Sequence, residues 1–306
     1  MNLFEILRTH TVPQITHNKV PDWMMGCFKR KSISFFNGET DIDTRVFWLQ
    51  TCSLTIDLRL PLPQDQASQH KHQGYLSKVH YEGWYAHAKW EHEQLSWNGG
   101  DSHQRHNKWP EPAILKRIGN CMIEFAPSDA YVEDWRLLSV EQSPVIGLEL
   151  VKEINLSTGQ TQFKKGALIV CGDYAGLVIN ASKQPKENNL ALAVDNAIDE
   201  DEIKELLNFQ TSVAVKDEDG HFIIQHSLDL EKVNQKIMDF DKFEFEKETN
   251  HLIYKFKNDN EEIHQYFKLE TYIPDFRFSS KTTPSSDAIA WFEKENATLT
   301  RYTQVY

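Results

Sequence analysis

Short strand-like segments recur along almost the whole chain, and they limit its fold more than any other feature. The clearest example is RVFWLQTCSLTIDLRLP, from Arg45 to Pro61, in which two β-like runs meet at Thr51-Cys52-Ser53. Sequences typical of tight turns occur at Asn37-Gly38, Asn98-Gly99-Gly100, Gly119-Asn120, Asp219-Gly220 and Asn258-Asp259-Asn260. Many short strands with few helices between them predict an antiparallel meander, and closure into a barrel removes its exposed edges.

Helical periodicity is confined to three short segments, Leu3–Thr9, Asp199–Asn208 and Asp287–Asn296. The expected fold class is therefore mainly β, an antiparallel β-barrel with few short helices and a C-terminal β extension. The chain has 306 residues, of which 40% are hydrophobic, so it can bury a sizeable core. The polar run EKVNQKIMDFD, at Glu231–Asp241, interrupts the strand pattern. We therefore predict a barrel domain over residues 1–235 and an acidic β-hairpin extension over residues 236–306 that packs on the barrel.

The negative charge of the chain is concentrated toward its C-terminus. Residues 1–185 carry 19 Lys and Arg against 20 Asp and Glu, whereas residues 186–306 carry 14 against 25. Binding to a phosphate backbone needs clustered Lys and Arg, so we expect no nucleic-acid partner. No apolar run approaches the roughly 18–20 residues that span a bilayer, so no membrane partner is expected either. The N-terminal run MNLFEILRTHTVPQ lacks a basic leader, so we expect a cytoplasmic location. The four cysteines are widely spaced, which predicts free thiols in a reducing compartment.

The run from Pro21 to Pro61 carries a longer pattern. It resembles the start of an uncharacterised family of bacterial proteins with a lipocalin-like β-barrel, whose usual pattern includes D-T-x-V-x-W-L-Q-T-x-S-L and D-I-R-[IL]-P. This chain reads DTRVFWLQTCSL and DLRLP at the same places. Further matches are Trp90, Tyr131–Trp135, Val170–Asp173 and TSVAVKDEDGHFIIQHSLDL, the last of which looks like the family's closing hairpin.

The resemblance covers residues 20–232 and implies a lipocalin-like barrel. It supplies no reaction, so no catalytic residue follows from it. The chain departs from the family at Trp90-Glu91-His92, where the family has Trp-His-Arg, and at Gly83-Trp84-Tyr85, which replaces a glycine-rich segment. The final seventy or so residues lie outside the resemblance.

Polar residues share strand faces with tryptophan in the Arg45–Pro61 stretch. Alternation places Trp48 and Gln50 on one face of the first run, and Asp57 and Arg59 on one face of the second. Both faces of the first run are bulky, so we expect it to be buried on both sides. Two interpretations of the second run stay open. Asp57 and Arg59 either line a pocket beside Trp48, which would suit an amphipathic ligand, or form a salt bridge on the exterior of the barrel.

Tryptophan is concentrated in one part of the chain. Five of the eight tryptophans fall within 52 residues, namely Trp84, Trp90, Trp97, Trp109 and Trp135. Amphipathic rings are common in binding sites, and they also fill the centres of large barrels, so both roles stay open. The residues expected to bind a ligand are Trp48, Gln50, Asp57, Arg59, Trp84, Trp90 and Trp135.

Histidine is concentrated between His70 and His106. His70-x-His72 and His103-x-x-His106 have spacings that a metal could use. Both pairs lie in polar, loop-like sequence, which favours solvated side chains. We therefore predict no metal site and no cofactor, with haem or zinc as the lesser alternative.

Three carboxylates are candidates for a catalytic acid or base, Asp57, Glu124 and Glu133, because burial near aromatic rings raises carboxyl pKa values. No nucleophile elbow, phosphate loop or dinucleotide fingerprint occurs. The favoured function is binding of an amphipathic or lipophilic small molecule in the lumen. The alternatives are a barrel enzyme of the isomerase, hydratase or cyclase type, and an interaction module that uses the acidic C-terminal region. Whether the protein is an enzyme, and whether it forms a homodimer, stays open.

Overall fold

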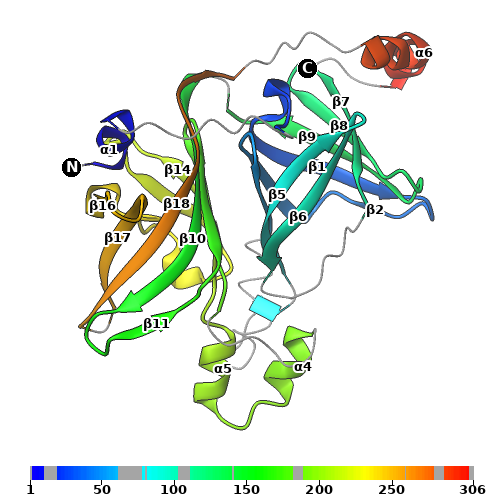
Figure 1. Cartoon of the computed structure of the whole chain (residues 1–306). Helices are drawn as coiled ribbons and strands as arrows, with labels where there is room; N and C mark the ends of the chain where they lie inside the picture. The colour runs from blue at the N-terminus through cyan, green and yellow to red at the C-terminus, as the bar shows by residue number, and fades with distance from the viewer. Residues whose placement is uncertain are drawn as a thin grey trace.

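The computed structural model describes residues 2–9, 19–60, 78–79, 81–102, 111–139, 141–181, 189–258, 260–278 and 286–302 (Figure 1). Two antiparallel β-sheets lie side by side and hold the strands of this part of the chain. Helices are few, so the predicted mainly β fold class is confirmed. No helix among these residues is long and apolar enough to cross a membrane.

The first sheet closes into an eight-stranded antiparallel barrel. Its strands are β1 (Gly26–Phe35), β3 (Arg45–Gln50), β4 (Leu54–Leu60), β5 (Gly83–Glu91), β6 (Gln94–Ser102), β7 (Ala113–Ile118), β8 (Cys121–Phe125) and β9 (Tyr131–Leu137). Each pairs with the next, and β1 also pairs with β9, which closes the cylinder. The short β2 (Thr40–Asp41) forms a hairpin with β1 outside this ring. Closure leaves no unpaired edge among the eight strands, which is the physical reason that we expected a barrel.

The second sheet is open and follows the barrel in the sequence. Its strands are β10 (Gln142–Asn155), β11 (Gln160–Gln162), β12 (Gly166–Cys171), β13 (Tyr174–Ile179), β14 (Gln210–Lys216), β15 (Phe222–Ser227), β16 (Phe243–Glu246), β17 (His251–Asn258) and β18 (Glu261–Arg277). The strand order is β15-β14-β13-β12-β10-β18-β17-β16, and β11 pairs with β10. The family resemblance places the β14–β15 hairpin at the closure of the barrel, and this is wrong. The hairpin forms an edge of the second sheet, because β9 already occupies the free edge of β1.

The strand pairing changes from one sheet to the other between β9 and β10. Strands β16 to β18, which belong to the predicted C-terminal extension, join the second sheet through the long pairing of β18 with β10. The division into domains at residue 235 stays a prediction, because strand pairing alone does not define an independently folding unit.

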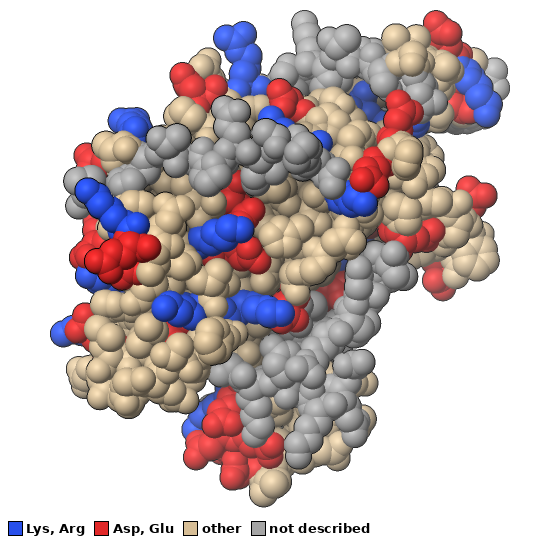
Figure 2. Space-filling model, in the orientation of Figure 1, with Lys and Arg blue, Asp and Glu red and all other residues tan. Residues whose placement is uncertain are grey.

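Two of the predicted helices are α1 (Leu3–Thr9) and α5 (Glu200–Leu206). The side chain of Asp199 caps α5 by accepting a hydrogen bond from the backbone N–H of Glu202 at 2.8 Å. The acidic first turn of α5 contributes to the acidic patch at the lower end of the molecule in Figure 2. The third predicted helix, Asp287–Asn296, lies within α6 (Ser286–Tyr302). The remaining helical elements are α4 (Leu190–Asp195) and the 3₁₀ turns η1 (Asp22–Met24), η2 (Leu230–Lys232) and η3 (Phe240–Lys242).

One predicted turn is wrong. The turn between β5 and β6 lies at His92 and Glu93, which both have positive φ (51° and 60°). Asn98-Gly99-Gly100 falls inside β6, where the pairing with β5 shifts next to Tyr85. A Cβ on Gly100, whose φ is +73°, would lie 2.0 Å from the carbonyl oxygen of Tyr85. The glycines therefore form a β-bulge and let the backbone of β6 approach that of β5 closely, and they do not reverse the chain.

The second sheet packs against the outer face of β3 and β4. Gly176 of β13 comes so close to Leu49 of β3 that a Cβ there would lie 2.8 Å from Leu49 Cδ1. Every residue of β3 from Val46 to Gln50 is buried, as predicted for a strand that is covered on both sides. Because another sheet shields this wall from outside, polar groups on its inner face lie away from bulk water.

Candidate functional site

The inner face of β3, β4 and β5 brings together the polar residues singled out in the sequence. Trp48 pairs directly opposite Asp57, and Asp57 pairs opposite Trp84. Arg59 lies two residues further along β4, so it shares this face. The side chains of Asp57 and Arg59 are only 7% and 12% exposed, and both line a cavity with Trp48. The interpretation that they form an exterior salt bridge is therefore wrong.

The cavity lies toward the end of the barrel where β4 ends and β9 begins. It is lined by Trp48, Thr55, Asp57, Arg59, Trp84, Trp97, Glu124, Tyr131, Glu133 and Trp135. The cavity has a volume of about 20 Å³ and lies within a hollow of about 310 Å³, part of which is open to solvent. The resting side chains thus leave room for about one water molecule, and a larger ligand must use the open side or displace a ring.

Four tryptophan rings form the apolar wall of the cavity. The ring centroids of Trp48 and Trp135 are 5.4 Å apart at an interplanar angle of 79°, and those of Trp84 and Trp97 are 5.7 Å apart at the same angle. Trp48 and Trp97 join the two pairs at 6.3 Å and 67°. Edge-to-face packing of this kind is favourable for aromatic rings. The rings therefore fill the barrel centre and also line the cavity, while their role in binding a ligand stays a prediction.

Gln50 holds one of these rings in place. Trp48 Nε1 donates to Gln50 Oε1 at 3.0 Å, and Thr55 Oγ1 donates to the same oxygen at 2.6 Å. Gln50 Nε2 donates to the carbonyl oxygens of Thr51 (2.8 Å) and Leu54 (3.1 Å). Gln50 is fully buried and does not line the cavity, so its predicted contact with a ligand stays a prediction.

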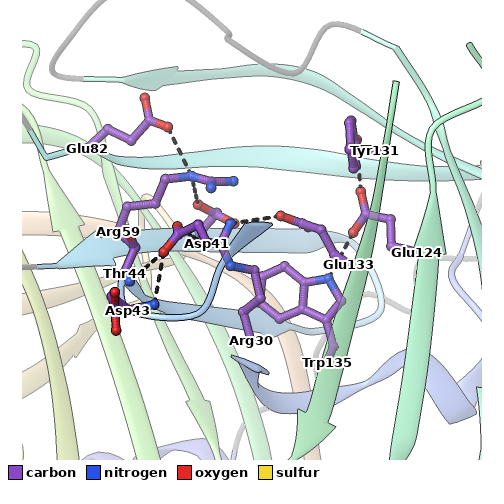
Figure 3. A network of polar contacts seen from close by, with 11 residues as sticks. Arg30, Asp41, Asp43, Thr44, Arg59, Glu82, Glu124, Tyr131, Glu133 and Trp135 are labelled. Carbon is purple, nitrogen blue, oxygen red and sulfur yellow. Dashed lines mark hydrogen bonds and ion pairs between the residues drawn. The ribbon is translucent and has the colours of Figure 1, made fainter. Parts of the chain in front are cut away.

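Two buried arginines each bridge two carboxylates (Figure 3). Arg30 Nη1 lies 2.9 Å from Glu133 Oε1, and its Nη2 lies 2.6 Å from Asp41 Oδ2. Because Arg30 belongs to β1 and Glu133 to β9, this ion pair crosses the seam that closes the barrel. Arg59 Nε lies 3.3 Å from Asp57 Oδ1 and 3.0 Å from Glu82 Oε1.

Glu124 of β8 accepts hydrogen bonds from two neutral side chains. Tyr131 Oη donates to Glu124 Oε1 at 3.2 Å, and Trp135 Nε1 donates to Glu124 Oε2 at 3.1 Å. Both donors come from β9, where Tyr131, Glu133 and Trp135 alternate with more exposed residues. This alternation points all three toward the lumen.

The environment raises the pKa of two of these carboxyl groups. Burial raises the pKa of Asp57 to about 7, the Arg59 charge opposes this change, and the Glu82 and Glu133 charges add to it. Burial also raises the pKa of Glu124 well above its ordinary value, together with the Glu133 charge, against the hydrogen bond from Tyr131. A carboxyl group that titrates near neutral pH inside a cavity is typical of functional sites.

Stability is expected to depend on pH through Asp57. The folded-state pKa of Asp57 (about 7) exceeds the unfolded value of about 4, so between these values the folded state holds the additional proton. The stability that Asp57 contributes is then fully present below about pH 4 and is lost as the pH rises through about 7. The free energy of unfolding of wild type should fall relative to Asp57→Asn by more than about 2 kcal/mol over this range, since one pKa unit corresponds to about 1.4 kcal/mol. Urea titrations of both proteins measure the difference, with Asp173→Asn at a half-exposed site as control. A difference that stays constant from about pH 4 to 7 would contradict the raised pKa.

Most of the predicted site residues line the cavity, but not all of them. Trp48, Asp57, Arg59, Trp84 and Trp135 line the cavity, as do the catalytic candidates Glu124 and Glu133. Trp90 lies elsewhere and packs edge-to-face on Trp23 at 5.8 Å. Their roles toward a ligand or a substrate stay predictions.

Sequence reasoning did not select several residues that complete the site. These are Arg30, Thr55, Glu82, Trp97 and Tyr131. The alternation of Tyr131, Glu133 and Trp135 is a signal that could have found the tyrosine. Glu82 and Arg30 gave no such signal, because each reaches the site through a partner that is distant in the sequence.

Metal ligation has no support among the described residues, which contain no group of three or more His, Cys, Asp or Glu side chains placed to hold an ion. The predicted histidine pairs, His70 with His72 and His103 with His106, lie outside the described residues. All four cysteines are free thiols, and Cys27, Cys52 and Cys171 are buried.

Comparison with known proteins finds no match to this chain. No family model, no curated protein and no solved structure matches the chain. The candidate function therefore depends on the geometry and electrostatics of the cavity.

Proposed function

We propose that the barrel binds a small amphipathic molecule in the cavity beside Trp48, Trp84, Trp97 and Trp135. Binding pockets for small molecules combine mostly apolar walls with a few placed polar groups, and this cavity has four indole rings beside Asp57 and Glu124. We also infer that the chain is a distant member of the lipocalin-like family that residues 21–61 resemble. The closed eight-stranded antiparallel barrel supports that inference.

Buried polar atoms on the cavity wall that lack a hydrogen bond are the main support for this proposal. The indole Nε1 atoms of Trp84 and Trp97 are buried, and neither has a hydrogen-bond partner among the described residues. Asp57 Oδ1 is also buried, and it has an ion-pair contact with Arg59 Nε at 3.3 Å but no hydrogen bond from a described residue. A buried polar atom without a partner is destabilising by about 1–3 kcal/mol. A ligand that accepts hydrogen bonds from the indoles and donates one to Asp57 would remove this penalty while its apolar part lies against the rings.

Tryptophan fluorescence tests the proposal directly. We expect alkyl and phenylalkyl compounds of different charge to change the emission of the wild-type protein. Trp97→Phe removes an N–H donor and part of the ring, so the affinity should fall about fivefold or more, because an aromatic contact contributes about 1 kcal/mol. Trp23→Phe is the matched control, since Trp23 packs on Trp90 and does not line the cavity.

Native mass spectrometry of the purified protein supplies a second measurement, because it detects a molecule that stays bound during purification. The proposal fails if no compound of the panel changes the emission and the measured mass equals that of the chain alone.

A second candidate function is acid–base catalysis in the same cavity. The raised pKa of Asp57, about 7, favours it, because a group that titrates near the working pH transfers protons best. Any turnover should then depend on pH with a maximum near neutrality, and Asp57→Asn should abolish that dependence. The acidic C-terminal region as an interaction surface, the homodimer and the cytoplasmic location stay predictions.

A further inference from the structure

We propose that the ligand of this cavity is an organic cation, an amphipathic amine whose ammonium group lies beside Asp57 and Glu124 while its apolar body lies against the tryptophan rings. This inference rests on the proposed function and narrows it to one chemical class of ligand. It excludes fatty acids and other ligands whose polar end is a carboxylate.

Among the described residues, the polar network inside the barrel contains more buried carboxylates than guanidinium groups. Four carboxylate side chains belong to residues that are at most 5% exposed, namely Asp57, Glu82, Glu124 and Glu133. Among the described residues, the guanidinium groups that ion-pair with this network are those of Arg30 and Arg59, and Arg30 also bonds Asp41. Within the described part of the chain, this network thus has two more buried carboxylates than guanidinium groups, and a positively charged ligand would reduce that difference.

Two of the carboxylates on the cavity wall can accept further hydrogen bonds. Glu124 accepts from Tyr131 and Trp135, which are both neutral. Asp57 Oδ1 has an ion-pair contact with Arg59 Nε at 3.3 Å and no hydrogen bond from a described residue. An ammonium group supplies three N–H donors together with a positive charge, and hydrogen bonds between charged partners are the strongest of their kind.

The tryptophan wall suits the same class of ligand. The face of an indole ring carries negative electrostatic potential, so it attracts a cation and also packs against an apolar body. Trp84, which pairs directly opposite Asp57, and Trp97 line the cavity together with that carboxylate. An anionic ligand would instead meet Asp57, Glu124 and Glu133, while Arg59 already has two carboxylate partners.

Protonation of the empty site follows from the same imbalance. Burial raises the pKa of both Asp57 and Glu124; the Glu133 charge adds to this effect at both groups and the Arg59 charge opposes it, while the charges of Glu82 and Arg30 act on Asp57. Without a bound cation, Asp57 is therefore mostly protonated below about pH 7, and Glu124 keeps its proton to a higher pH than an exposed glutamate. Binding of an ammonium group releases one, so affinity for an amine should rise as the pH increases toward 7, by about tenfold per pH unit for each proton released.

Three probes of equal shape and different charge test the inference, 2-phenylethylammonium, 2-phenylethanol and phenylacetate. Isothermal titration calorimetry of the full chain, in buffers with different ionisation enthalpies, measures both the affinity and the number of protons released. We expect the ammonium compound to bind at least about tenfold more tightly than the other two and to release about one proton near pH 6. Glu124→Gln should lower the affinity for the ammonium compound alone, whereas Glu91→Gln, on the exposed β5–β6 hairpin, should not.

The possible outcomes separate this inference from the function on which it rests. If 2-phenylethanol or phenylacetate binds as tightly as the ammonium compound, the inference is wrong while binding in the lumen stands. If the fluorescence panel gives binding but none of these three probes does, the inference is again wrong. If nothing in either experiment binds, the proposed function fails as well. Gln keeps the size of Glu, its amide oxygen can accept from Trp135 Nε1, and the Tyr131 hydroxyl can accept from its amide nitrogen, so circular dichroism should show an intact fold in Glu124→Gln.

Discussion

Arg30→Met is expected to lower the free energy of unfolding by about 3–5 kcal/mol. Arg30 is almost completely buried and forms ion pairs with Glu133 and Asp41 across the β1–β9 seam. Removing one partner of a buried pair leaves the other charge without compensation, and losses of about this size are typical. Because this pair joins the first strand of the barrel to the last, we expect the closing seam to weaken most. Urea-induced unfolding followed by circular dichroism measures the change.

Arg136→Met is the matched control for this prediction. Arg136 lies on β9 and pairs with Asp134, but its side chain is 37% exposed, so we expect a loss below about 1 kcal/mol. Adding Glu133→Gln to Arg30→Met removes the uncompensated charge and should restore at least about half of the lost stability. A loss below about 1 kcal/mol in Arg30→Met itself would show that this ion pair does not stabilise the seam.

Trp48→Ala is expected to destabilise the barrel by a similar amount, about 3–5 kcal/mol, because it leaves a large cavity in a packed core. Trp48 is 2% exposed and contacts the rings of Phe28, Trp97 and Trp135. Its Nε1 also donates to Gln50, whose amide oxygen then loses one donor. Thermal and urea unfolding measure the effect, and Trp23→Ala at a partly exposed position should lose less than half as much.

Added indole provides a check on the cause of this loss. If the variant folds with an empty space of the shape of the missing ring, indole should bind there and raise its Tm, since a ligand that binds the folded state alone stabilises it. Wild type, in which Trp48 fills that space, should respond less. Equal responses of the two proteins to indole would contradict the cavity explanation.

Arg30 and Trp48 belong to neighbouring parts of the barrel interior, the polar network and the tryptophan cluster. The tryptophans form the apolar wall of the cavity, while the arginines balance part of the carboxylate charge around it. The outer face of β3 and β4 is covered by the second sheet, so water is excluded from that side of the strands that carry the charges. A site of this kind changes its proton content when a charged ligand arrives, which is the property that the calorimetric experiment measures.

Local patterns were enough to predict much of the fold. The β3–β4 hairpin, the helices α1 and α5, and the turn at Gly119-Asn120 follow from alternation, capping and turn chemistry, which act between residues close in the sequence. The Asn98-Gly99-Gly100 prediction failed for a reason of the same kind. A glycine pair permits a turn and a bulge equally well, and only the neighbouring strand at Tyr85 determines which one forms.

The sequence by itself determined that this chain is a mainly β protein and that Trp48, Asp57 and Arg59 lie on facing strands of one hairpin. Only the tertiary structure decided that this face is the inside of the barrel, and that Glu82, Glu124 and Arg30 meet it there. The physical reason is that alternation assigns residues to one of two faces but not to inside or outside. That choice was made by the pairing of β1 with β9 and by the second sheet, whose approach at Gly176 covers the opposite face.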